Sequence, residues 1–150
     1  MSDEMKNYFE LQRLDAITTL MTNGFVGSAT SFYVEKGVPY LTSKNIRKSG
    51  IDAGNMVFVN SEFHENNKKS ILRHGDLLMV QSGHIGTCAV VDEKWEGSNC
   101  HALIIIRLDQ QRVDPKYAAY YLNSGIGEPT RGICVGGERT VGCEQANWMV

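Results

Sequence analysis

Basic side chains gather in two parts of this chain that also hold neutral hydrogen-bonding residues. The first group follows an expected strand and comprises Thr42, Ser43, Lys44, Asn45, Arg47 and Lys48. The second group precedes another expected strand and includes Lys68, Lys69, Arg73 and His74. Lysine and arginine on connecting segments suit phosphate oxygens, and short polar side chains fix register on a nucleic-acid backbone. The two groups predict one positively charged rim for a polyanion, with an unliganded solvated surface as the alternative.

A glycine-containing loop, residues 81–87, joins two expected strands with the sequence Gln-Ser-Gly-His-Ile-Gly-Thr. Its glycines allow a ligand to approach the backbone closely. Amide, hydroxyl and imidazole groups can bond base edges in the major groove, and this loop supplies them from Gln81, Ser82, His84 and Thr87. A simple glycine turn is the alternative. The loop does not fit a phosphate-binding P-loop, which needs Gly-Lys-Ser/Thr opening a helix. Its Gly83-His-Ile-Gly86 spacing matches the RNA-binding KH loop, but that loop joins helices, whereas this one is expected to join strands.

Residues suited to catalysis or metal binding are sparse. Cys100 and His101 are adjacent, so on an extended strand they would point to opposite faces and act poorly as nucleophile and base. A small hydrolase built on His84, Cys100 and His101 is the weakest alternative. Zinc would need Cys88, Cys100, His101 and Cys143 to be gathered by the fold, without any Cys-x-x-Cys pair. We expect no catalytic residue, no cofactor and no metal.

Composition restricts the possible partners. The 15 Lys and Arg against 17 Asp and Glu give a formal net charge of −2, so a nucleic-acid surface would have to be local. A length of 150 residues with 42% apolar composition predicts a single domain over residues 1–150. The acidic, polar start of the chain predicts no secretory signal, and the apolar runs are too short for a membrane span. We therefore expect a cytoplasmic protein.

The elements that must position these residues predict an α+β fold. Apolar residues at helical spacing predict an N-terminal helix over about residues 3–22, ending at Asn23-Gly24. Residues 25–108 change to short β-branched and aromatic segments, which predict a mainly β body. The expected strands are 38–42, 56–59, 77–81, 88–91 and 102–108, the last being apolar on both faces and hence central.

The C-terminal part predicts one short helix followed by an irregular tail. Asp114-Pro115 is a typical helix start, and Asn123-Ser124-Gly125 should end the helix, giving bounds of about 115–123. Residues 125–150 hold six glycines and show no clear periodicity.

Residues 11–123 carry a series of short motifs: Leu14-x-x-Ile17, Asn23-Gly24, Gly37-Val-Pro-Tyr-Leu, Asn45-Ile, Gly75-Asp-Leu-Leu, Ser82-Gly-His-Ile-Gly86, Ser98-Asn99 before an apolar strand, and Val113-Asp-Pro-Lys-Tyr before a Tyr-Tyr-Leu helix. In its order and spacing, this series resembles the target recognition domain of type I restriction-modification specificity subunits. In that family the domain reads a DNA half-site for a partner methyltransferase. Members carry two such domains joined by long spacer helices, whereas we expect one such domain in these 150 residues, which show no heptad segment.

The resemblance implies a mixed α/β domain with a curved sheet that binds double-stranded DNA without catalysing a reaction. Its partners would be the modification (methyltransferase) and restriction subunits, which would bring S-adenosylmethionine, ATP and Mg. Together with the local charge, it predicts base contacts from Thr42, Ser43, Lys44, Asn45, Arg47, Gln81, Ser82, His84 and Thr87, and phosphate contacts from Lys48, Lys68, Lys69 and Arg73. The main alternative is a truncated specificity-subunit fragment that acts only as a protein-interaction module.

Overall fold

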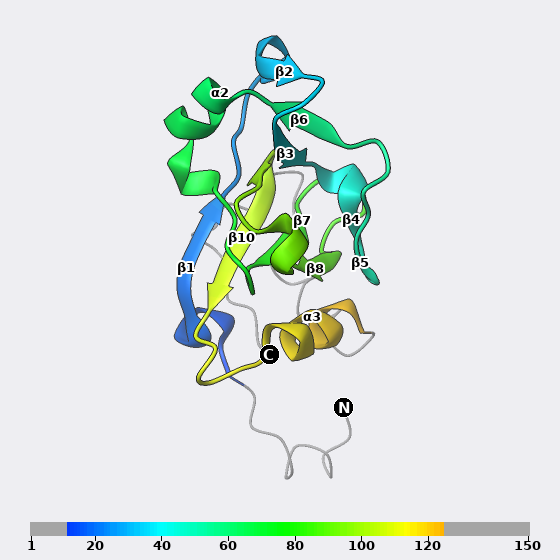
Figure 1. The fold of residues 1–150 in the computed structure, drawn as a ribbon. Coiled ribbons are helices and arrows are strands. Elements are labelled where there is room, and N and C mark those ends of the chain that lie inside the picture. The colour runs from blue at the N-terminus through cyan, green and yellow to red at the C-terminus, as the bar shows by residue number, and fades with distance from the viewer. Residues whose placement is uncertain (1–11, 125–150) are drawn as a thin grey trace, which may run out of the picture.

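The computed structural model describes residues 12–124, which form an α+β fold (Figure 1). Within these residues the strands make two four-stranded sheets and one two-stranded ribbon. The α-helices are α2 (Ser61–Asn66) and α3 (Pro115–Asn123), and the 3₁₀ helices are η1 (Leu14–Ile17), η2 (Thr30–Phe32), η3 (Ser43–Asn45), η4 (Lys68–Ser70) and η5 (Glu93–Trp95). The strands are β1 (Thr18–Asn23), β2 (Tyr33–Val34), β3 (Val38–Leu41), β4 (Ile46–Arg47), β5 (Gly50–Ile51), β6 (Val57–Val59), β7 (Leu77–Val80), β8 (Cys88–Val90), β9 (Asn99–Cys100) and β10 (Leu103–Leu108).

The four-stranded sheet with the longer strands, which we call the larger sheet, has the order β1-β10-β7-β8. All neighbouring strands in it are antiparallel. Its interior strand β10 is buried on both faces, which confirms the prediction that this apolar run is central. Because side chains alternate along a strand, Ile104 and Ile106 join one core cluster while Leu103 and Ile105 join another. The sheet therefore separates two hydrophobic cores.

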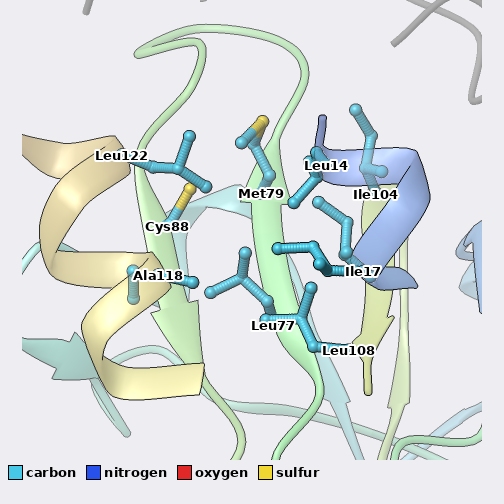
Figure 2. Close-up of a cluster of buried hydrophobic side chains, with 11 residues drawn as sticks. Leu14, Ile17, Leu77, Met79, Cys88, Ile104, Leu108, Ala118 and Leu122 are labelled. Atoms are coloured by element: carbon cyan, nitrogen blue, oxygen red, sulfur yellow. The ribbon is translucent and has the colours of Figure 1, made fainter. Parts of the chain in front are cut away.

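Helix α3 and the 3₁₀ helix η1 cover one face of this sheet. Figure 2 shows Ala118 and Leu122 of α3 packed towards Leu77 and Cys88, with Leu14 of η1 on the other side of the cluster. Asp114 caps α3 by accepting hydrogen bonds from the backbone N–H groups of two first-turn residues. The helix has the predicted bounds, with its start at Asp114-Pro115 and its end before Ser124.

The opposite face of the larger sheet is covered by the second core cluster. This cluster, the ribbon-side core, contains Ile46 of β4 and Leu72, which precedes β7, together with Leu78 and Val80 of β7. Both the β4–β5 ribbon and the segment before β7 therefore lie on this same side of the sheet. The smaller sheet, ordered β2-β6-β3-β9, lies with α2 towards one end of the molecule (Figure 1) and has an aromatic core around Tyr40 and Phe63.

The predicted N-terminal helix is wrong from Thr18 onward, whereas Leu14–Ile17 within it forms the 3₁₀ helix η1. Thr18–Asn23 forms strand β1, which pairs antiparallel with β10 along its length. Three of its six residues are β-branched threonines, which favour extended backbone, and pairing with β10 outweighs the helical apolar spacing. Gly24 acts as a close-contact residue rather than a helix end, because an added Cβ would lie 2.6 Å from the Cys100 Sγ. Residues 3–11 of the predicted helix lie outside the described residues.

The five predicted strands are present with ends shifted by one residue at most. The structure adds the short strands β2, β4, β5 and β9, whose two-residue lengths leave too little pattern to detect. In the part of the chain that the structure describes, no helix is long and apolar enough to cross a membrane. The predicted irregular tail, 125–150, lies outside that part, and the single-domain assignment stays a prediction.

Candidate nucleic-acid interface

The loop of residues 81–87 packs against the β4–β5 ribbon. The His84 Nε2 lies 3.3 Å from the Ile46 carbonyl oxygen of β4. The base of the loop is closed by hydrogen bonds from the Val80 N–H to the Thr87 carbonyl and from the Gly86 N–H to the Val80 carbonyl. Gly83 and Gly86 have φ angles of 82° and 87°, which suit glycine and produce this tight shape. The two predicted base-contact segments therefore meet in space.

Four side chains of these two segments are exposed and polar: Lys44, Arg47, Ser82 and His84. We call them the reading surface. Arg47 lies 3.9 Å from the Asp52 carboxylate, with both side chains about half exposed. Such an exposed ion pair contributes little to stability, so Arg47 can exchange it for a base edge or a phosphate. Space around Gly83 is open, since a Cβ added there would meet no atom within 4 Å.

Asn45, predicted to contact a base, has a structural role instead. It is only 1% exposed, and its Oδ1 accepts hydrogen bonds from the Thr42 N–H and hydroxyl. Its Nδ2 donates to the carbonyl oxygens of Asp52 and Gly54 beyond the ribbon. Thr42 completes a capping box at η3, and Thr42 and Ser43 are both half-buried. Asn45 thus fixes the segment that presents Lys44 and Arg47.

Gln81 and Thr87 also face inward, each with 8% exposure, so the prediction that they reach base edges does not fit this structure. The Gln81 Nε2 donates to the Ala102 carbonyl oxygen at 2.7 Å. Ala102 has a φ angle of 46°, an unfavourable conformation for a residue with a side chain. Gln81 therefore ties the start of the loop to a strained residue before β10. Of the loop side chains named above, Ser82 and His84 remain available to a ligand.

Three of the predicted phosphate-contact residues gather in one hollow. Lys68, Lys69 and Arg73 line a cavity of about 400 Å³ together with Arg107, Leu20 and Ile71, and we call it the Arg73 hollow. The fourth candidate, Lys48, is exposed in the β4–β5 turn and lines a separate hollow of about 500 Å³ between the ribbon, β8 and α3.

The prediction of a single positively charged rim requires the two basic groups to form one cluster. In the structure the two groups lie apart. The residues of η4 contact β1 at one edge of the larger sheet, whereas the β4–β5 ribbon contacts β8 at the opposite edge. In the sequence both groups are connectors between expected strands, and the strand order that separates them is set by long-range pairing. Both groups nevertheless flank the ribbon-side core, because Leu72 and Ile46 belong to it.

Arg107 also lines the Arg73 hollow, although the sequence did not identify it as a candidate site residue. Its Nε and Nη2 donate to the two carboxylate oxygens of Asp76 at 2.8 and 2.9 Å, and Asp76 is fully buried. The same carboxylate accepts the Arg73 N–H at 2.8 Å, which fixes the turn carrying Arg73. Hydrogen bonding to Asp76 raises the pKa of Arg107 above its usual value. The detectable signal was one arginine within the apolar run Leu-Ile-Ile-Ile-Arg-Leu.

In the described part of the chain, the cysteine and histidine residues do not assemble a nucleophilic site. Cys100 is fully buried, and burial raises the pKa of its thiol far above the usual range, so the thiol stays protonated. His101 Nδ1 lies 3.0 Å from the Tyr40 hydroxyl, which gives this imidazole a structural partner. Among residues 12–124, no group of three or more His, Cys, Asp or Glu side chains could hold a metal. Cys143 lies outside these residues.

Cys100 is expected to resist alkylation by iodoacetamide in the folded chain between about pH 7 and 9 and to react after unfolding in urea, because the reactive thiolate is disfavoured by burial. Peptide mass spectrometry of native and unfolded samples measures this directly. Rapid modification of native Cys100 near neutral pH would instead show an activated nucleophile and revive the hydrolase alternative.

The fold and the site define a mixed α+β domain that presents a polar loop on a β-ribbon at one edge of its sheet. No protein-family model matches the sequence, and no curated protein matches it. The fold is similar to part of the HsdS subunit from Thermoanaerobacter tengcongensis, with a TM-score of 0.62 and 13% sequence identity. The match covers 93% of this chain and 32% of that subunit, so this chain spans about a third of the subunit's length. At this identity the likeness establishes a shared fold.

Proposed function

We propose that this chain binds double-stranded DNA sequence-specifically as the target recognition component of a type I restriction-modification system. Two features support the proposal: the fold shared with HsdS, the specificity subunit of such systems, and the motif series over residues 11–123. The observation that carries it is the packing of His84 against the Ile46 carbonyl, which joins two polar segments into the reading surface.

The reading surface contains the group types that discriminate base pairs in the major groove. An arginine fork bonds guanine O6 and N7, while hydroxyl and imidazole groups donate or accept at several base edges. Arg47 would supply the first contact, and Ser82 and His84 would supply the others. Lys44 adds positive charge for a neighbouring phosphate or guanine. Asn45 and Gln81, being buried, would hold these side chains in register instead of touching DNA.

The partners of this function would be the modification and restriction subunits. Methyl transfer, ATP-driven translocation and cleavage would take place on those subunits, which would hold S-adenosylmethionine, ATP and Mg. The chain itself would contribute binding and orientation alone.

The test selects this chain's preferred sequence from a pool of random duplexes at low and moderate salt. Wild type is expected to enrich a short motif, and His84→Ala to reduce discrimination at one base position by about 5- to 100-fold, as expected for loss of one base contact. His74→Ala is the matched control, because it removes an exposed imidazole outside the reading surface. The control should retain the wild-type motif.

Salt-sensitive binding without any enriched motif would contradict sequence-specific recognition of DNA. An absence of DNA binding would favour the interaction-module alternative, for which the structure offers one specific surface. Tyr117 and Tyr120 of α3 are 55% and 77% exposed, and tyrosine is enriched in protein interfaces. Size-exclusion chromatography with light scattering would then show self-association that Tyr120→Ser reduces.

A further inference from the structure

The Arg73 hollow combines a strong local positive charge with a defined shape. Four cationic side chains line it, and the walls are completed by Leu20 of β1 and Ile71. Two carboxylates offset this charge: Asp76, buried against Arg107, and Glu65, 3.7 Å from the Lys68 Nζ in an exposed pair. The hollow therefore keeps a net positive charge in a chain whose overall charge is −2. Its ligand should be an anion.

Arg107 gives the hollow a rigid donor. A guanidinium has five N–H donors, and Asp76 takes two of them through the paired contacts to Nε and Nη2. Three donors are left for a further acceptor, and the bidentate contact holds their directions fixed. Pre-organised arginine donors favour phosphate and carboxylate, which accept two parallel hydrogen bonds. Exposed Lys68, Lys69 and Arg73 can then close around the same anion.

The hollow lies diagonally across the sheet from the reading surface. It sits beside β1 and the start of β7, whereas the reading surface lies beyond β8 and at the end of β7. Three strand spacings give roughly 14 Å across the sheet, and the length of β7 gives about the same distance along it. The two sites are therefore on the order of 20 Å apart. Both flank the ribbon-side core, so one duplex lying over that side can reach both.

We infer that the Arg73 hollow binds a backbone phosphate of the same duplex, at a position about half a helical turn from the bases under the reading surface. Phosphates of one strand recur about every 3.4 Å along the axis, so 20 Å corresponds to about six nucleotides. Anchoring there fixes the register of the duplex and carries no sequence information. Asp76 is a positioning residue, because it orients Arg107 and the Arg73 turn. This inference rests on the proposed function for the identity of the ligand.

The DNA test compares Lys69→Gln/Arg73→Gln with a matched control, Lys36→Gln/Lys116→Gln, which removes two exposed cations elsewhere. The hollow variant is expected to bind about tenfold more weakly at low salt, with its salt slope reduced by about 1, while selecting the same motif. Phosphate-ethylation interference should disappear at a phosphate about six nucleotides from the motif. Unchanged interference, or loss confined to phosphates within the motif, would overturn the inference.

A second test does not depend on sequence-specific DNA binding. The ¹⁵N-labelled chain is titrated with inorganic phosphate against sodium chloride at equal ionic strength. Phosphate is expected to shift the Arg107 Nε–H and Arg73 amide resonances, and Lys69→Gln/Arg73→Gln should abolish the shift of the Arg107 Nε–H resonance. An absence of shifts would refute the phosphate site even if the chain selects a DNA motif. Shifts without the DNA interference would assign the hollow to a free phosphate ion and overturn the backbone contact.

If wild type selects no motif, the proposed function fails while the phosphate titration still tests the hollow. The two failures are therefore distinguishable.

Discussion

Arg107→Met is expected to lower the free energy of unfolding by about 3–5 kcal/mol. The substitution keeps the length and apolar stem of the side chain but removes the partner of a carboxylate that has no exposure to water. Asp76 would then be a buried charge with the Arg73 N–H as its remaining short contact in residues 12–124. Urea denaturation followed by circular dichroism measures the change.

The matched control for this prediction is Arg47→Met. Its guanidinium lies 3.9 Å from an exposed Asp52 carboxylate, so its loss should cost under about 1 kcal/mol. The double variant Arg107→Met/Asp76→Leu should recover part of the loss, because it removes the stranded charge along with its partner. A loss below about 1 kcal/mol for Arg107→Met, similar to that of the control, would show that the pair does not stabilise the fold.

Asn45→Ala is expected to lower the free energy of unfolding by about 3 kcal/mol, through the loss of a cap and of several buried hydrogen bonds. The carbonyl oxygens of Asp52 and Gly54 lose a donor, and the Thr42 N–H loses its acceptor. Because these bonds hold the segment that carries Lys44 and Arg47, DNA affinity should fall as well. Thermal unfolding and the duplex titration measure the two effects.

Asn66→Ala is the matched control, since Asn66 is exposed at the end of α2. The free energy of unfolding of this variant should differ from that of the wild type by less than about 0.5 kcal/mol. Asn45→Asp separates the two halves of the side chain, because it keeps an acceptor for Thr42 and loses the donor to the carbonyl oxygens of Asp52 and Gly54. If Asn45→Ala kept full stability but lost base discrimination, Asn45 would be a base-contact residue after all, and the structural role assigned to it would be wrong.

Sequence patterns that extend over a few residues were sufficient to predict a large part of the fold. The apolar run of β10 identified it as a central strand, because a strand buried on both faces needs apolar side chains on both. Asp114-Pro115 set the start of α3, because a capping carboxylate and a fixed proline φ act within one helical turn. The α+β fold class followed from such local patterns together with the motif series.

Long-range strand pairing determined the conformation of the N-terminal segment, Thr18–Asn23. The apolar spacing from Leu14 to Met21 fits a helix, yet Thr18–Asn23 is a strand because β10 offers an antiparallel partner some 85 residues away. Local propensity carries no information about that partner, and its hydrogen bonds outweigh a helix weakened by threonines.

The candidate interface shows the same division. The sequence by itself determined which segments carry polar and basic groups, and it placed them in connectors between strands. The tertiary structure alone decided that Asn45 and Gln81 turn inward, that Arg107 joins Lys68, Lys69 and Arg73, and that the two basic groups lie at opposite sheet edges. The physical reason is that a polar side chain goes where its hydrogen-bond partners are, and the partners of Asp76 and Gln81 belong to strands or strand ends distant in the chain.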